Sequence, residues 1–277
     1  MKNILLVMLF LSSTMTSFAQ ATVDDARNQL NHVIDSLEVS PEGKDFAFAV
    51  AEMILLHRVD SVIEEGRYLQ ALTVLDSIQV YWKKLTDKDP SVSMYARKGT
   101  ILMTLEEWQP LLTMCDECLR IHKESLTNKE GGLVYSMQGY AYRNIEKYLE
   151  AVKSYESAIL YYTKDDNIGS VADMTCNMAY CYGKLSKYST TSNLYEKGIA
   201  KFLEYYNITR SRLLAGEFKV ADSYKKSVLG VFSAHLLDFA IFEEKIGNKQ
   251  ASKEYLLMSA HCGNDIAKRE YQRIYGY

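Results

Sequence analysis

The chain has 277 residues, with 35 acidic and 32 basic side chains and a formal net charge of −3. This mildly acidic balance, without a block of basic residues, argues against a nucleic-acid-binding protein. Only three prolines and 14 glycines occur, and neither type clusters within the periodic segments, so long helices are expected.

The N-terminus has the pattern of a secretory signal peptide at residues 1–19. Lys2 supplies the positive start, residues 4–11 are all apolar, and Ser17 and Ala19 are small residues suited to a cleavage site. The apolar run is much shorter than the roughly 20 residues of a membrane span. No cysteine follows it that could carry a lipid anchor. An amphipathic first helix is the alternative, but the run is apolar on all faces. We expect export, to the periplasm or beyond, after cleavage near Ala19–Gln20.

An aromatic residue then recurs every 40 positions, in the same local frame each time. Two further positions recur with the same period. One is a mostly small or apolar residue three places after the aromatic residue, and the other is a small residue in the segment that precedes the aromatic residue. A period shared by several linked positions marks an array of like structural units. The recurring positions are Tyr68, Trp108, Tyr148 and Tyr188; Ala71, Leu111, Ala151 and Thr191; and Gly99, Gly139 and Ala179.

Each unit is predicted to be a helical hairpin. Residues 148–159 place apolar side chains at i, i+3, i+4 and i+7, which is the pattern of an amphipathic helix, and residues 133–143 do the same. The polar break 144–147 separates the two helices. The helical pattern excludes a WD40-type propeller of similar period, and HEAT repeats remain an alternative of similar length. The small residues that recur every 40 positions favour closer helix packing than HEAT repeats need.

These motifs resemble the tetratricopeptide repeat (TPR) family, whose signature is W-x2-L-G-x2-Y followed by A-x3-F. The resemblance implies an all-α, right-handed α-solenoid of about five TPR-like helix hairpins with N- and C-terminal capping helices. Its units would be about six residues longer than the family's usual 34. The matching residues are Tyr135, Gln138, Gly139, Tyr142, Ala151 and Tyr155 in one unit, and Thr175, Met178, Ala179, Tyr182, Thr191 and Tyr195 in the next.

The register is lost after Glu204 and is expected to return with a shift of 60 residues, so that Asn248 takes the place of Tyr188. This shift predicts a non-repeating insertion with room for specific function. The resulting division is a capping helix (22–37) and linker within 20–43, four repeats in 44–206, the insertion 207–227, and a fifth, divergent repeat with a C-terminal capping helix in 228–277.

The cysteines and histidines show no pattern of a redox or metal site. Cys115 and Cys118 form a C-x-x-C, but they fall at repeat positions that elsewhere hold packing residues. Burial in the core is therefore favoured over redox chemistry, and no obligatory disulfide is expected. The five histidines lack metal-ligand spacing, and no phosphate-binding loop, nucleophile elbow or zinc-protease motif occurs. We expect no catalytic residue, metal or cofactor.

In the TPR family, the concave groove is lined by first-helix residues that packing does not consume. The resemblance assigns such positions to two neighbouring units. Tyrosine combines apolar area with a polar tip, and the cationic side chains could bind a carboxylate. The family's carboxylate clamp is not reproduced. The positions are Leu133, Ser136, Tyr140, Arg143 and Asn144 in one unit, and Asp173, Cys176, Tyr180 and Lys184 in the next.

The sequence therefore favours a non-catalytic, exported scaffold or adaptor whose groove binds a peptide or protein partner. We expect no nucleic-acid partner and no membrane span in the mature chain, since no second segment reaches the length of a span. The alternative is an extracytoplasmic sensor that binds a small ligand, either in a tyrosine-lined pocket or at the insertion. An enzyme is a third hypothesis, which would need histidines and carboxylates to converge in space.

Overall fold

The computed structural model describes residues 52–53, 56–57, 59–86, 88–220 and 223–276. The expected signal peptide and N-terminal capping helix lie outside these ranges. Their assignments therefore remain predictions from the sequence.

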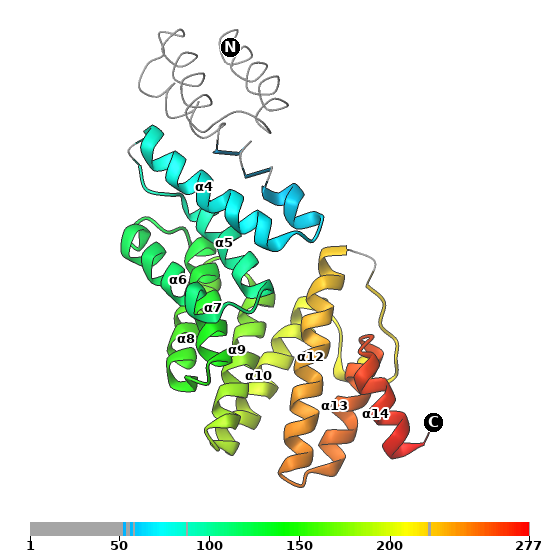
Figure 1. Ribbon diagram of the computed structural model, residues 1–277. Coiled ribbons are helices and arrows are strands. Elements are labelled where there is room, and N and C mark those ends of the chain that lie inside the picture. The colour runs from blue at the N-terminus through cyan, green and yellow to red at the C-terminus, as the bar shows by residue number, and fades with distance from the viewer. Residues whose placement is uncertain (1–51, 54–55, 58, 87, 221–222, 277) are drawn as a thin grey trace. The chain divides into compact units, whose positions relative to one another are not determined.

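All regular secondary structure in the described ranges is helical, and helices that are adjacent in the chain pack together in pairs (Figure 1). This arrangement of successive helical hairpins confirms the predicted fold class. The helices are α4 (Tyr68–Thr86), α5 (Val92–Thr104), α6 (Trp108–His122), α7 (Asn128–Asn144), α8 (Tyr148–Lys164), α9 (Ile168–Lys184), α10 (Tyr188–Tyr206), α11 (Arg210–Leu214), α12 (Ser223–Lys245), α13 (Lys249–His261) and α14 (Asp265–Tyr275).

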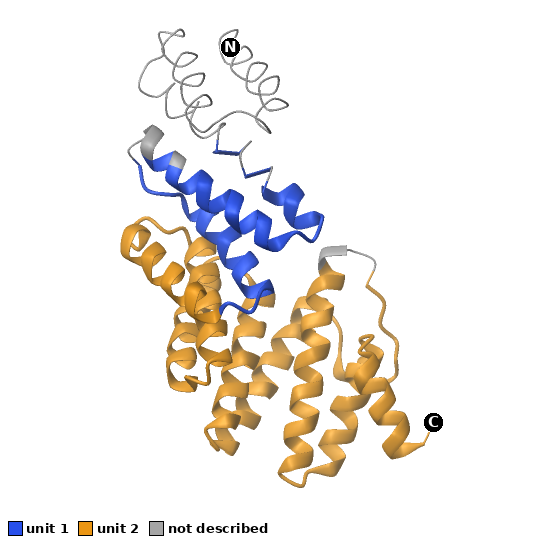
Figure 2. Ribbon diagram, in the orientation of Figure 1, with its two compact units in different colours: residues 1–107 blue, residues 108–277 orange. Residues whose placement is uncertain are grey.

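The chain divides into two compact units at Glu107 (Figure 2). In the first unit, α4 and α5 pack together with the helical residues 59–64. Their shared core includes Val59, Leu75 and Met94, none of which has any exposed surface. The side chains thus alternate between core and solvent at helical spacing, as an amphipathic helix requires.

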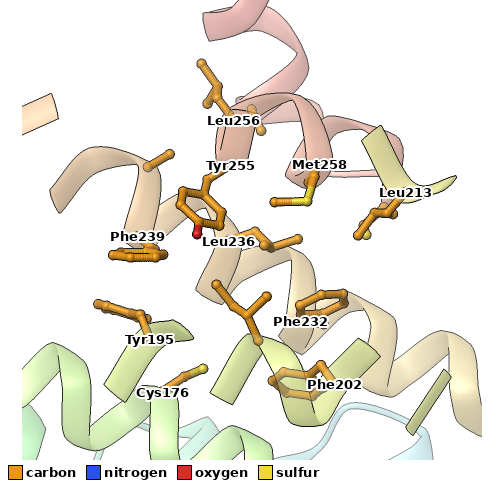
Figure 3. Packing of buried hydrophobic residues seen from close by; sticks show 14 of the residues in the cluster. Cys176, Tyr195, Phe202, Leu213, Phe232, Leu236, Phe239, Tyr255, Leu256 and Met258 are labelled. Carbon is orange, nitrogen blue, oxygen red and sulfur yellow. The ribbon is translucent and has the colours of Figure 1, made fainter. Parts of the chain in front are cut away.

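The second unit, which begins at Trp108, holds an extensive core among its described residues. Figure 3 shows aromatic rings from α10, α12 and α13 in this core. Tyr195 stacks on Phe239 with ring centroids 4.7 Å apart, and Phe239 contacts Tyr255 at 4.4 Å. A second stack joins Phe202 to Phe232 at 4.7 Å. These large, fully buried rings fix α12 and α13 onto α10 through both area and ring geometry.

Close packing within the hairpins depends on the small residues of the 40-residue repeat. A Cβ at Gly139 would lie 2.5 Å from the ring of Tyr155, which is fully buried between α7 and α8. Gly198 of α10 faces α9, where a Cβ would come within 3.1 Å of the Ala172 carbonyl oxygen. The first distance is shorter than real Cβ atoms show, and the second is tighter than most of them show. The predicted role of these positions in close helix approach is confirmed.

The turn inside each hairpin has one conformation throughout the array. Its middle residue has a positive φ: 73° at Gly66, 58° at Glu106, 63° at Glu146, 59° at Ser186 and 87° at Gly247. Backbone hydrogen bonds repeat around it, for example from the N–H of the next residue back to a carbonyl five positions earlier. The second helix begins two residues after this position in every case. The ladder of aromatic residues therefore marks helix starts, as predicted.

The turn geometry corrects the predicted register beyond the insertion. Ser186 and Gly247 occupy the same left-handed position, and the helices that follow begin at Tyr188 and Lys249. The shift is therefore 61 residues rather than 60, and Lys249, not Asn248, is the equivalent of Tyr188. The sequence comparison missed this because it aligned Tyr195 with Tyr255. Both are core residues, but they lie one position apart in the repeat.

The segment between α10 and α12 contains the expected extra element. Asn207 ends α10 in the left-handed conformation with a φ of 51°, and the five-residue α11 follows at once. Leu213 of α11 is fully buried, and the carbonyl of Leu213 lies 2.9 Å from Nδ1 of His261 on α13. The helix α12 begins at Ser223, four residues before the end expected for the insertion.

All five cysteines are free and buried. Cys115 and Cys118 lie on the core side of α6, which confirms that they are packing residues. Burial raises the pKa of the Cys118 thiol to about 12, and the nearby Glu130 and Glu117 add to the shift. A thiol in this environment stays protonated, so it is a poor nucleophile and a poor metal ligand.

Candidate functional site

A polar network joins the first helices of two neighbouring hairpins, α7 and α9. The hydroxyl of Tyr140 donates to Asp173 Oδ2 at 2.8 Å and accepts from Asn177 Nδ2 at 3.2 Å. Asn177 also donates to Asp173 Oδ1 at 2.7 Å. Burial raises the pKa of Tyr140 far above its usual value, and the negative charge of Asp173 adds to the effect. The phenol is therefore a fixed donor, and the network holds the two helices in register.

Arg143 extends this network along α7. Its Nη1 donates to Asn177 Oδ1 at 2.5 Å. The guanidinium carbon lies 4.9 Å from the ring centre of Tyr180 on α9 and 5.6 Å from that of Tyr140. A guanidinium over aromatic faces gains cation–π attraction, which increases as water is excluded. The side chain of Arg143 thus fills the space between α7 and α9 and is itself only partly exposed.

The helix α12 joins the network from the fifth hairpin. Its His235 is buried, and Nε2 lies 2.7 Å from Asp173 Oδ1, while Nδ1 has no hydrogen-bond partner within the described residues. One turn later, Asp238 lies near Arg143 and Lys184. Burial raises the pKa of the Asp238 carboxyl, although the charges of His235, Arg143 and Lys184 oppose that shift. Desolvation therefore outweighs the favourable charges around this group.

A pocket of about 160 Å³ opens between α9, α10 and α12. Its walls combine aromatic rings with charged and hydroxyl side chains. Two exposed lysines lie at it, with Lys184 Nζ 5.2 Å from the ring centre of Tyr180 and Lys245 Nζ 5.8 Å from that of Tyr188. The lining residues are Tyr180, Gly183, Lys184, Thr191, Tyr195, Asp238, Ile241, Phe242 and Lys245.

The structure brings only part of the sequence-predicted groove set to this site. Tyr140, Arg143, Asp173, Tyr180 and Lys184 lie in the network or at the pocket. Other residues of the predicted set form hydrogen bonds within their own helix or are buried in the core. Ser136 is buried and donates to the carbonyl of Leu133 at 2.8 Å, Asn144 donates to the carbonyl of Tyr140 at 2.8 Å, and Cys176 is fully buried.

Asn177 and His235 of the polar network were not predicted, and neither were Asp238 and the other pocket residues of α10 and α12. Asn177 lies one helical turn after Asp173, so the i, i+4 spacing of two polar residues on an otherwise apolar helix was a signal. His235 and Asp238 share one face of α12 at i, i+3, but no motif assigned that helix to the groove. Their position depends on the register beyond the insertion, which the sequence comparison placed one residue off.

The described residues contain neither a metal-binding cluster nor a helix fit to span a membrane. No group of three or more His, Cys, Asp or Glu side chains there could hold a metal ion. No helix in the described part of the chain combines the length and the apolar character needed to cross a membrane.

Comparisons with known proteins agree with the repeat architecture. No protein-family model matches the sequence, and no curated protein does. Solved structures do match. BtubC (BKLC) from P. vanneervenii aligns with 98% of this chain and 93% of its own length, at 14% identity and a TM-score of 0.59. A protein described as a kinesin light chain from Podospora anserina, with nearly identical TPR-like repeats, aligns with 80% of this chain and 96% of its own, at 12% identity and a TM-score of 0.53.

The chain has the tetratricopeptide-repeat fold. The resemblance noted in its sequence motifs and the likeness to these structures agree, although identities of 12–14% extend the likeness to fold alone. Within this TPR-type fold, α7, α9 and α12 are the first helices of their hairpins, and α8, α10 and α13 are the second helices. The polar network and the pocket therefore lie on the first-helix side of the array.

Proposed function

We propose that the chain is a non-catalytic, exported scaffold that binds a peptide or protein partner on the face formed by α7, α9 and α12. The observation that carries this proposal is the concentration of aromatic and charged side chains on that face. Tyr180, Lys184 and Lys245 surround a pocket there. Aromatic anchors in partly desolvated pockets, surrounded by polar groups, are the usual hot spots of protein interfaces.

The network beneath this face supports a binding role. Tyr140, Asp173, Asn177 and Arg143 bond to one another, so Tyr180 is presented on a surface that is already ordered. Preorganised side chains lose less conformational entropy on binding than free ones do. Tyr140 itself uses its hydroxyl inside the network, so its contribution is to fix the surface, and the contact with a partner falls to Tyr180 and Lys184.

The absence of catalytic motifs from the sequence supports a non-catalytic role. The partly buried Asp238 and the buried His235 are the nearest approach to an acid–base pair on α12, but the hydroxyl of the nearby Ser233 donates to the carbonyl of Gly230 and not to His235. Export is proposed from the N-terminal sequence alone. Fractionation of the native cells and N-terminal sequencing of the mature chain test it, and a mature chain that still carries residues 1–19 would refute export.

The partner-binding proposal is tested by capture from the native envelope, with Tyr180→Ala and Lys184→Ala combined in one variant. We expect a loss of at least tenfold in captured partner, with unchanged helicity by circular dichroism. Leu149→Ser is the matched control, because Leu149 is 59% exposed on the second helix α8. If the control loses the partner while the double variant retains it, the binding face has been wrongly assigned.

A small-molecule sensor is the second candidate function. The specific observation in its favour is the pocket of about 160 Å³ lined by Tyr180 and Tyr195. A sensor of this kind would copurify with a ligand that mass spectrometry detects after denaturation. Thr191→Leu fills this pocket from α10 and would abolish such copurification, whereas a protein partner on the outer face would still be captured.

A further inference from the structure

The repeat register reveals that one side chain of the polar network is missing from the next hairpin. Between α7 and α9, Arg143 reaches across to Asn177. Forty residues after Arg143, at the same distance from the turn, α9 has Gly183. Sixty-one residues after Asn177, again at the same distance from its turn, α12 has Asp238. The pair α9 and α12 therefore has the acceptor of this contact without the guanidinium.

The pocket of about 160 Å³ lies where that guanidinium would be. Both Gly183 and Asp238 line it. A Cβ added at Gly183 would meet its nearest neighbour, Cγ2 of Thr191, at 3.4 Å, which is an ordinary van der Waals contact, so a side chain can start from this position without a clash. A volume of this size has room for several water molecules, and hence for a planar guanidinium and part of its methylene stem. Aromatic rings of Tyr180 and Phe242 supply its walls.

Two polar groups at the pocket have no hydrogen-bond partner among the described residues. Tyr195 is only 2% exposed, and its hydroxyl bonds to no other described side chain or backbone group. The carboxylate of Asp238 likewise accepts no hydrogen bond from a described residue, although Arg143 and Lys184 lie near it. Both groups line the pocket, so each is available to accept a hydrogen bond from a ligand donor.

We propose that this pocket binds the guanidinium group of an arginine side chain supplied by a protein partner. The proposal rests on the partner-binding function proposed above and names the chemistry that the partner presents. A guanidinium is planar, donates up to five hydrogen bonds and stacks on aromatic faces. It would donate to Asp238 and to the oxygen of Tyr195, and would lie beside Tyr180 as Arg143 does in the preceding hairpin.

The lysines at the pocket do not change this choice of ligand. Lys184 and Lys245 are both exposed, so water and salt screen their charges. The carboxylate of Asp238 is partly buried and is screened less. An anion in the pocket would have to lie against that carboxylate, whereas a guanidinium neutralises it. Binding of acetate or phosphate in place of arginine is thus an outcome that overturns the proposal.

The first experiment titrates the full-length mature protein with N-acetyl-L-arginine methylamide and with its citrulline counterpart, which has the same shape without the charge. We expect saturable millimolar binding of the arginine compound, detected by NMR shifts, and at least tenfold weaker binding of the citrulline compound. Asp238→Asn should abolish the difference. Glu244→Gln is the control, because it removes an exposed charge from the same helix. Equal binding of both compounds, or no binding, overturns the proposal.

The second experiment supplies the guanidinium from the chain itself. Gly183→Arg copies Arg143 into the next hairpin, and Gly183→Gln is its uncharged control. We expect Gly183→Arg to melt at least 2 °C above Gly183→Gln, to lose the arginine compound, and to lose its advantage when combined with Asp238→Asn. If the advantage persists with Asp238→Asn, the carboxylate is not the acceptor and the proposal fails.

These results are separable from a failure of the proposed function. The titration uses purified protein and needs no partner, so the guanidinium site can be refuted while capture of the partner remains intact. Conversely, if the arginine compound binds but no envelope protein is captured through Tyr180 and Lys184, the scaffold function fails and the guanidinium site stands.

Discussion

Gly198 is the position where the close approach of two helices can be tested most sharply. It lies inside α10, and an added Cβ would overlap with Sγ of Cys176 on α9. Two backbone atoms of α9 are also close, with the Ala172 carbonyl oxygen at 3.1 Å and the Cys176 nitrogen at 3.3 Å. A flexible side chain could move away, but these backbone atoms can move only if the helix moves.

The expected cost of Gly198→Ala follows from two opposing effects. Alanine favours a helix interior over glycine by roughly 0.5–1 kcal/mol, whereas overpacking a core costs about 1–3 kcal/mol. The clash involves backbone, so we place the cost in the upper part of that range and expect a net loss of about 1–2 kcal/mol. For a chain of this size, each kcal/mol lowers the melting temperature by roughly 2–4 °C.

The assay is thermal and urea unfolding followed by far-UV circular dichroism. Gly230→Ala in α12 is the matched control, because no atom lies within 4 Å of its added Cβ. We expect Gly230→Ala to gain about 0.5–1 kcal/mol from helix propensity alone. If Gly198→Ala is as stable as Gly230→Ala, the contact between α9 and α10 is looser than the structure shows.

A double-mutant cycle separates the two parts of the clash. Cys176→Ala removes Sγ but leaves the backbone of α9 in place. We expect Gly198→Ala to cost about 1 kcal/mol less in the Cys176→Ala background, since neighbouring sites that share a clash are not additive. An additive cycle would show that the cost of Gly198→Ala does not come from Sγ.

Three further predictions concern the turns, the pocket and the thiols. Ser186→Gly should increase the free energy of unfolding in urea by about 1 kcal/mol. Ser186 has a φ of 59°, and a positive φ costs a non-glycine residue roughly 1 kcal/mol. Ser186→Ala should give no such gain, because alanine is strained at this φ as serine is. Asp238→Asn should raise the melting temperature at pH 7 by about 2 °C. The pKa of Asp238 is raised by burial, so its ionised form destabilises the folded state at pH values above that pKa. This destabilisation disappears as the pH falls and the carboxyl is protonated, so the melting temperatures of the two proteins should converge near pH 4. A constant difference in melting temperature between pH 7 and pH 4 would refute the reasoning. Thiol reagents should leave the cysteines of the folded protein unmodified at pH 8 and should label all five in urea. All five are buried, and burial raises the pKa of Cys118 to about 12. Rapid labelling of the folded protein would contradict their packing role.

The sequence predicted the hairpins well because their signals are local. The aromatic residue every 40 positions marks the start of a second helix, and the small residues mark close helix contacts, as at Gly139. Both follow from the 3.6-residue periodicity and from side-chain size, which need no long-range information. The extra helix α11 offered no such signal. Its five residues, Arg210–Leu214, are too few to show a helical period.

The site was predicted only in part because its chemistry depends on pairs that are distant in sequence. Tyr140, Arg143, Asp173 and Tyr180 follow from the repeat register. His235 does not, since its partner Asp173 lies 62 residues earlier, across the insertion. An error of one residue in a helix also rotates the predicted face by about 100°. The shift of 60 in place of 61 was therefore enough to hide the acceptor role of α12.

The two tryptophans lie near the start of the repeat array, so their fluorescence can show whether unfolding begins at that end. Trp82 is buried in the core of α4 and α5, and Trp108 is the first residue of α6. No tryptophan follows Trp108 in the sequence. The aromatic residues of the core around α10, α12 and α13 are tyrosine and phenylalanine. Tryptophan fluorescence therefore follows the N-terminal hairpins, and near-UV dichroism of tyrosine is weighted towards the C-terminal ones. In a repeat protein each hairpin is stabilised mainly by its neighbours. Two separate transitions in these signals would measure, without any label, how tightly folding is coupled along the chain.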